Sequence, residues 1–168
     1  MRMSDIISIC PGCGLKIPAE EDKLDGRYNA SLACRQLYSE LSYYTLSLQD
    51  TEFIHQLIVD TYAAQHSGKS MRPITTAFAL IGLYLTFERG FTGRQVQKAH
   101  MLLAQKTKNW PHFNPPRAKA SLTVLDVIYT SPGQARNEMI GKWGKSVWDV
   151  WEPEQKKIKG LAEAYLSI

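Results

Sequence analysis

ITTAFALIGLYLTF, residues 74–87, is the longest apolar stretch of this 168-residue chain. It is apolar almost all round, which is typical of a helix buried on every side. It is shorter than the ~20 residues that a membrane-spanning helix needs. Pro73 suits the first turn of such a helix, and Gly90 suits its end. We therefore predict a buried central helix around which the rest of the chain packs.

Two further helices are predicted on the N-terminal side of this stretch. Apolar residues recur at helical spacing over residues 28–48 and again over residues 51–65. Asp50 stands between the two segments and suits the cap of the second helix. Because the connection is short, we expect the two helices to form an antiparallel hairpin.

Helical signals also continue on the C-terminal side. Thr92 and Gln95 form a capping-box pattern that opens a helix to about residue 106. Segment 122–128 is ambiguous, because its β-branched residues favour a strand while its isolation among helices favours a helix; we predict a short helix. The remaining pattern predicts a proline-rich loop at 109–116, a helix from 132 to 151 whose cap is built from Ser131, Pro132 and Gln134, a break at 152–153, and a final amphipathic helix.

The overall composition is that of one globular domain. Hydrophobic residues make up 44% and charged residues 21%, and neither share suggests disorder. The net charge of +4 permits an anionic partner without requiring one. Residues 1–9 lack the long apolar core of a signal peptide. Three cysteines, an odd number, suit a reducing compartment better than a disulfide framework, so we expect a cytoplasmic protein without membrane association.

The strongest local motif is CPGCG at residues 10–14. Cys10 and Cys13 are separated by two residues, so both can reach one tetrahedral ion. Gly14 can adopt the positive φ that turns backbone N–H groups toward the sulfurs. A thioredoxin-like redox dithiol would need a helix after the motif, and Pro18 argues against one. A zinc deaminase would need a proline directly before the motif and a separate His-x-Glu, and the sequence has neither.

Two more ligands are needed to close a tetrahedral site. Residues about fifteen positions before and after the turn of a helical hairpin lie level with each other, which places Cys34 beside His66 at the open end. His55 lies about 16 Å along the same helix from His66, at 1.5 Å per residue, so these two cannot share an ion. The other candidate ligands in the sequence are Cys34, His55, His66, His100 and His112.

We therefore predict a closed zinc site formed by Cys10, Cys13, Cys34 and His66. The alternatives are a buried thiol at Cys34 and a histidine that simply sits at a helix C-terminus at position 66. Iron also accepts thiolate ligands. The predicted fold is all-α: a single-domain bundle of about six to seven helices over residues 28–168, with an irregular zinc-knuckle segment, residues 1–27, packed on it.

The chain resembles an uncharacterised bacterial family of helical proteins. The resemblance rests on the CPGCG motif, on the helix CRQLYSEL at residues 34–41, on VDTYAAQH at residues 59–66, and on the tryptophans at positions 143, 148 and 151. It covers most of the chain. It implies no reaction, but it supports treating the four predicted ligands as one set.

Three functions are compatible with these features. A closed zinc site favours a non-enzymatic, zinc-stabilised module that binds another macromolecule, a protein rather than a nucleic acid. A metal-dependent hydrolase would need an open position on the ion, with His66 or Asp60 acting on a bound water. A nucleic-acid binder would use the basic stretch 89–119 with its Trp110, His112 and Phe113. Asp60 and Tyr62 are candidates for orienting the His66 ring, and the late tryptophans are predicted to be core residues.

Overall fold

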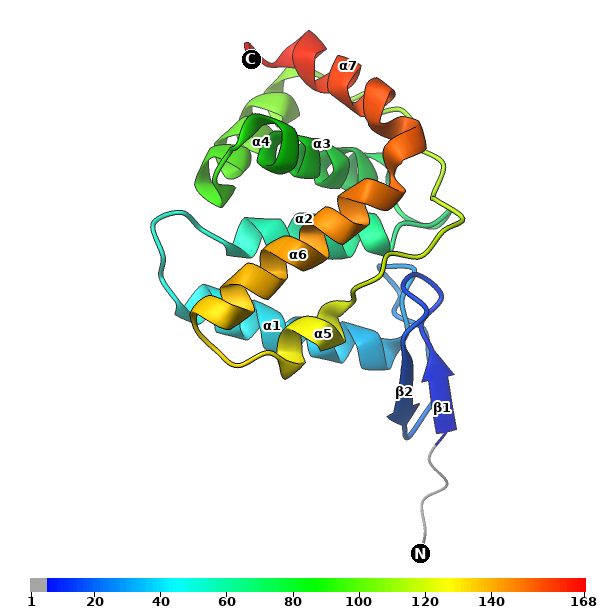
Figure 1. Cartoon of the computed structure of the whole chain (residues 1–168). Helices are drawn as coiled ribbons and strands as arrows, with labels where there is room; N and C mark the ends of the chain where they lie inside the picture. Colours follow the sequence, from blue (N-terminus) through cyan, green and yellow to red (C-terminus); the bar gives the residue numbers. More distant parts are fainter. Residues whose placement is uncertain (1–5) are drawn as a thin grey trace, which may run out of the picture.

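The computed structural model describes residues 6–168 of the chain. This part of the chain contains seven α-helices and one two-stranded sheet (Figure 1). The elements are β1 (Ile6–Ile9), β2 (Lys16–Ala19), α1 (Leu32–Ser47), α2 (His55–Gln65), α3 (Pro73–Arg89), α4 (Gly93–Lys106), α5 (Val124–Tyr129), α6 (Gln134–Val150), the 3₁₀ turn η1 (Glu152–Glu154) and α7 (Gln155–Tyr165). None of the described helices is both long and apolar enough to cross a membrane. The first five residues of the predicted knuckle, 1–5, lie outside the described residues.

The predicted central helix is confirmed as α3. It packs against α2, α4, α6 and α7, and Leu80, Ile81 and Leu83 are fully buried. Gly90 ends it in the left-handed conformation, with φ of 69°. The apolar character of α3 on every side therefore reflects neighbours on every side, as expected for a helix inside a bundle.

The contact between α2 and α3 is unusually close at one point. A Cβ placed on Gly82 would lie 2.0 Å from Oδ2 of Asp60. Asp60 is itself buried, and the Nε2 of Gln56 donates a hydrogen bond of 3.1 Å to its Oδ1. Burial raises the pKa of the Asp60 carboxyl well above its ordinary value, and the bond from Gln56 opposes that shift only in part. The carboxyl group therefore occupies space that exists only because residue 82 has no side chain.

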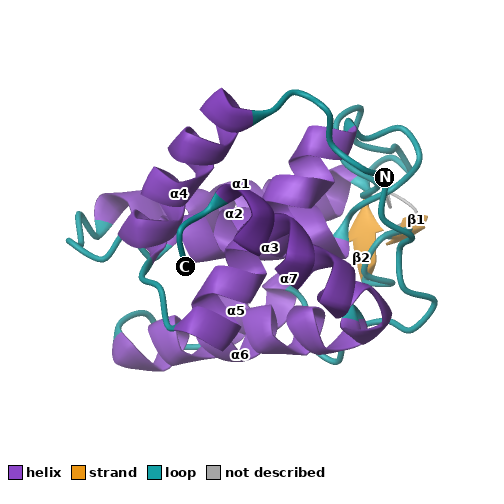
Figure 2. Cartoon of the chain, turned by 90° about the horizontal axis from the view of Figure 1, so that it is seen from above, coloured by secondary structure: helices purple, strands orange, loops and turns teal. Residues whose placement is uncertain are grey.

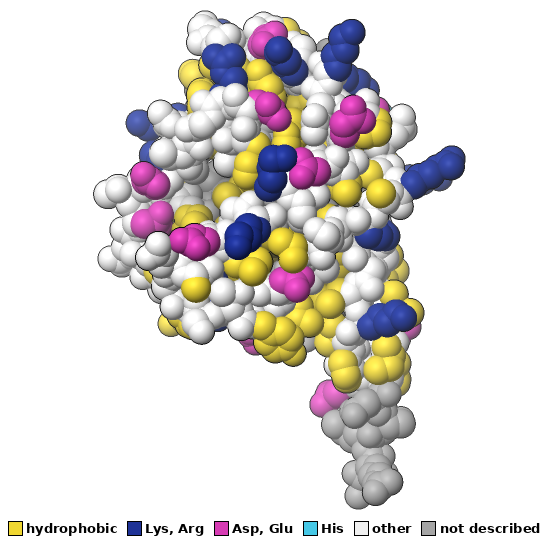
Figure 3. Space-filling view, viewed as in Figure 1, with side chains coloured by type: hydrophobic (Ala, Val, Ile, Leu, Met, Phe, Trp, Pro, Cys, Tyr) yellow, Lys and Arg dark blue, Asp and Glu magenta, His cyan; other side chains and the backbone are white. Residues whose placement is uncertain are grey.

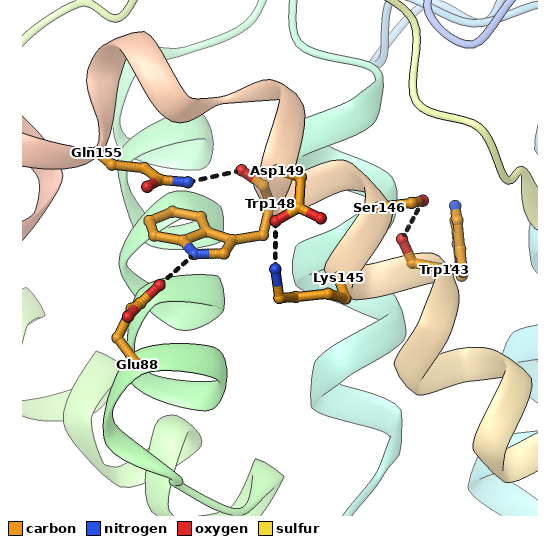
Figure 4. Close-up of polar contacts among 7 residues, drawn as sticks. All are labelled: Glu88, Trp143, Lys145, Ser146, Trp148, Asp149 and Gln155. Carbon is orange, nitrogen blue, oxygen red and sulfur yellow. Dashed lines mark hydrogen bonds and ion pairs between the residues drawn. The ribbon is translucent and has the colours of Figure 1, made fainter.

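The tryptophans of α6 and of the turn that follows it are core residues, as predicted. Trp143, Trp148 and Trp151 are almost completely buried. The indole Nε1 of Trp148 donates to Oε1 of Glu88 on α3, at 2.9 Å (Figure 4). In the same view, Nε2 of Gln155 donates to the Trp148 carbonyl at 3.0 Å, where α6 gives way to α7. These bonds join α3, α6 and α7, and the burial of all three indoles leaves them almost no surface for a partner.

Several helix boundaries differ from the prediction. Helix α1 begins four residues later than residue 28, because the Ser31 side chain accepts the Cys34 N–H and sets the start. Helix α2 begins at His55 rather than at residue 51, because Phe53 has a φ of 56° and breaks the helix there. Gly133, with φ of 104°, likewise delays α6 to Gln134, so the predicted cap at residues 131–134 is wrong. The predicted short helix α5 is confirmed, with a capping box from Thr123 and Asp126.

The fold is mostly helical but not strictly all-α, which corrects the predicted class. Part of the N-terminal segment, predicted to be irregular, is a sheet: β1 and β2 pair as an antiparallel hairpin with Ser8 opposite Ile17. Strands of four residues are too short to show a clear alternating pattern, and the CPGC motif provides the connecting turn. Figure 2 shows this hairpin on one side of the helical body, with several loops drawn around it.

Candidate metal centre

The CPGC motif forms the tip of the β1–β2 hairpin. The Cys10 N–H donates to the Leu15 carbonyl, and the Gly14 N–H donates to the Cys10 carbonyl, each at 2.8 Å. Gly14 has the predicted positive φ, 79°. The turn therefore closes on its own backbone, as a tight hairpin loop requires. A strand, β2, follows the motif. The motif therefore lacks the following helix that a thioredoxin-like dithiol needs.

The remaining two predicted ligands come from the open end of the α1–α2 hairpin. Cys34 lies in the first turn of α1, and His66 is the residue that ends α2. Their Sγ and Nε2 atoms are 3.4 Å apart. The expectation that the antiparallel hairpin places these two residues level with each other is confirmed.

The four side chains form one buried cluster. Cys10, Cys13, Cys34 and His66 are each at most 5% exposed, and their ligand atoms all lie within 4.8 Å of one another. A tetrahedral ion with Zn–S bonds of about 2.3 Å and Zn–N bonds of about 2.0–2.1 Å holds its sulfurs about 3.8 Å apart and a sulfur about 3.5 Å from a nitrogen. The Cys13–Cys34 sulfur distance is 3.9 Å, and the Cys34–His66 distance is 3.4 Å. The cluster could therefore hold one metal ion.

Tyr62 orients the His66 ring. Its backbone carbonyl lies 2.8 Å from His66 Nδ1 and accepts the ring proton, which leaves the lone pair of Nε2 facing the sulfurs. The two rings stack with centroids 3.9 Å apart, and the Tyr62 hydroxyl donates to Cys34 Sγ at 3.5 Å. The corresponding expectation for Asp60 is wrong, because its carboxyl group faces Gln56 and Gly82 instead.

Lys119 is a site residue that the sequence does not reveal. Its Nζ donates to the carbonyls of Pro11 and Gly12, at 2.8 and 2.7 Å, so it anchors the backbone of the hairpin tip. More than one hundred residues separate these groups, and no local pattern links them. The sequence shows Lys119 only as one of several basic residues in the stretch 89–119.

The three thiol groups affect one another's ionisation, because their sulfur atoms lie so close together. Hydrogen bonding from Cys13 and Cys34 lowers the pKa of Cys10 far below its ordinary value. Hydrogen bonding with Cys10 raises the pKa of Cys13 to about 12. Hydrogen bonding with Cys10 also raises the pKa of Cys34 above its ordinary value. Without a cation, the three thiols therefore resist ionising together, whereas a cation among them would favour three thiolates.

The other histidines lie outside this cluster. Nδ1 of His55 contacts the Thr45 hydroxyl at 2.8 Å. His100 is bonded to the Phe78 carbonyl at 2.8 Å, and burial lowers its pKa to about 4. His112 has an exposed side chain in the long loop before α5. Trp110 and Phe113 of the same basic stretch are at most 9% exposed, so neither ring is free to stack on a base.

Replacing Gly12 by alanine should weaken metal binding. A Cβ at this position would lie 2.5 Å from the Asn29 carbonyl oxygen and 2.6 Å from Cδ2 of His66, so it would push the histidine away from the sulfurs. We expect roughly a 10–100-fold loss of metal affinity, the size seen when a group that orients a ligand is removed. The measurement is competition with a chromophoric chelator. Gly26→Ala is the matched control, because a Cβ there meets no atom within 4 Å; equal affinities of the two variants would contradict the prediction.

Comparison with known proteins gives a family but no activity. Residues 8–152 match the family of unknown function DUF5946, and this range contains all four cluster residues and Lys119. No curated protein and no solved structure matches the chain significantly. The match extends over most of the sequence, and this chain therefore belongs to the family of unknown function DUF5946.

Proposed function

We propose that this protein is a zinc-stabilised helical module that binds another macromolecule, and that the zinc is structural rather than catalytic. The observation that carries the proposal is the buried cluster of three thiols and one imidazole within 4.8 Å. Three thiolates and a histidine complete the tetrahedral coordination of zinc, and closed sites of this kind are structural. Free cysteines at all three positions suit a reducing compartment such as the cytoplasm.

The position of the cluster supports a structural role. It gathers ligands from the hairpin tip, from the start of α1 and from the end of α2. The hairpin has only short strands and little core of its own, so an ion at this point would fix it to the helices. Such an ion leaves one net negative charge on three thiolates, and the Lys119 ammonium group beside the hairpin tip partly offsets it.

The two alternatives receive less support. A hydrolase needs an open coordination position and a nearby acid or base, but the cluster contains no carboxylate among the described residues, and Asp60 faces away from it. A nucleic-acid binder would need exposed aromatic rings in the basic stretch 89–119, where Trp110 and Phe113 are buried. A protein partner is therefore the better proposal.

The test is elemental mass spectrometry of the purified chain, followed by X-ray absorption at the metal edge. We expect about one zinc per chain, with a first shell of sulfur and one nitrogen and no water oxygen. An iron signal would change the identity of the metal but retain the ligand set. An oxygen ligand would instead favour the hydrolase, and a metal-free protein from zinc-supplemented cells would refute the proposal.

A further inference from the structure

A groove of about 380 Å³ runs between β2 and the N-terminal half of α1. Figure 1 shows β2 lying between β1 and α1, so the groove follows the side of the hairpin that faces the helix. Its walls are formed by residues 17–21 of the hairpin segment and by one side of α1. This groove is separate from the metal cluster but is built on the same elements.

The floor of the groove is apolar and its rim is acidic. Ile17, Leu32 and Leu37 are half-buried and line the floor. Glu20, Glu21 and Glu40 carry exposed carboxylates around it. Among the described residues, Glu21 pairs with Lys23, whereas Glu20 and Glu40 have no ion-pair partner within 4.0 Å. This acidic rim stands out on a chain whose net charge is +4.

Helix α1 serves the core and the groove with different faces. Cys34, Tyr38 and Leu41 are buried in the bundle. Ala33, Leu37 and Glu40 follow helical spacing along the neighbouring face and line the groove. In Figure 3, hydrophobic side chains continue from the helical body onto the hairpin at its base. Because Ile17, Leu32 and Leu37 stay only half-buried, the described chain covers the apolar side of the groove only in part.

The hairpin edge limits how an occupant can bind. Pro18 stands opposite Ile7 in the register and has no N–H group, so a strand added along β2 would lack a hydrogen bond at its centre. Side-chain contacts with the floor and charge contacts with the rim suit a helix better than an added strand. A helix with leucine-like anchors and flanking lysines or arginines complements both features.

We propose that this groove is a docking site for a basic amphipathic helix of a partner protein. The inference rests on the proposed function, because the metal would link the two walls: Cys10 and Cys13 belong to the hairpin, and Cys34 belongs to α1. Removal of the metal would separate these walls and weaken docking. The net-basic chain thus recognises a cationic segment through a local acidic surface.

The test uses fluorescence anisotropy of a fluorescein-labelled 14-residue peptide, LKKLLKLLKKLLKL, with the zinc-loaded full chain. We expect saturable binding that weakens roughly tenfold in Glu20→Gln/Glu40→Gln, equivalent to 1.4 kcal/mol. Leu37→Ser should weaken binding roughly fivefold or more while leaving every charge in place, as expected for an anchor pocket. The matched control is Glu138→Gln/Glu163→Gln, which removes two exposed carboxylates outside the groove and should bind as the wild type does.

Zinc content and thermal stability are measured on the same samples, which keeps the two proposals distinguishable. If zinc is bound but the peptide fails to bind, or binds equally to the groove and control variants, the docking site is wrong and the structural metal stands. If no metal is present, the proposed function fails irrespective of the peptide. Sedimentation that shows self-association, lost in Glu20→Gln/Glu40→Gln, would identify a second copy of this chain as occupant and overturn the proposal of a separate partner protein.

Discussion

Cys34→Ser is expected to lose the zinc that we propose for the cluster and to unfold at a much lower temperature than the wild type. The substitution removes a thiolate from the start of α1 and leaves three donors in a buried site. Because metal binding energy is also folding energy, the loss should be several kcal/mol, a large share of the ~5–15 kcal/mol that stabilises a typical domain. The helical core should remain folded at low temperature, since α3 is buried among α2, α4, α6 and α7 without help from the cluster.

The measurement combines zinc content after dialysis with thermal unfolding followed by circular dichroism. His66→Ala should behave like Cys34→Ser, because its Nε2 lies 3.4 Å from the Cys34 sulfur. His112→Ala is the matched control, since it removes an exposed imidazole that does not belong to the cluster. Full zinc retention in Cys34→Ser would remove Cys34 from the ligand set. If only His66→Ala retains zinc, an open coordination position becomes plausible and hydrolase substrates should be screened.

Gly82→Ala is expected to destabilise the fold by about 3 kcal/mol or more, the upper part of the range for overpacked cores. The new methyl group would lie 2.0 Å from Asp60 Oδ2 and 2.6 Å from its Cγ, and both residues are buried where α2 meets α3. The helices must then move apart, or the carboxyl group must leave its bond with Gln56. Neither change leaves the surrounding core intact.

Urea unfolding measures this effect, with Gly160→Ala in α7 as the matched control. No atom lies within 4 Å of a Cβ at Gly160, so that substitution should stabilise the helix by up to about 1 kcal/mol. The double variant Asp60→Ala/Gly82→Ala should lose less free energy of unfolding than the sum of the losses of the two single variants. The reason is that shortening Asp60 makes room for the methyl group. Strict additivity would show that the close contact does not cause the loss.

Local patterns explain why much of the helical framework could be predicted. The all-round apolar character of residues 74–87 identified α3, and the Thr92–Gln95 capping box identified the start of α4. The errors occurred where the backbone departs from a common conformation. Phe53 has a positive φ, which is rare for a bulky residue and cannot be predicted from its type. This conformation shifts the start of α2 to His55.

The candidate site was predictable because its ligands combine a local motif with simple geometry. The spacing of Cys10 and Cys13 is a local property, and the length of the α1–α2 hairpin brought Cys34 level with His66. The groove between β2 and α1 was not predictable in the same way. The β-hairpin that forms one of its walls has strands of only four residues, which the sequence pattern could not distinguish from irregular chain.

The sequence by itself determined that this protein is mostly helical, that α3 is central, and that four particular side chains are candidates for one metal ion. These conclusions depend on periodicity and on short spacings, which a linear chain displays directly. Only the tertiary structure decided that Lys119 anchors the hairpin tip and that position 82 has no room for a side chain beside Asp60. Such contacts join residues far apart in the chain, and their distances depend on how whole helices pack, which no local pattern contains.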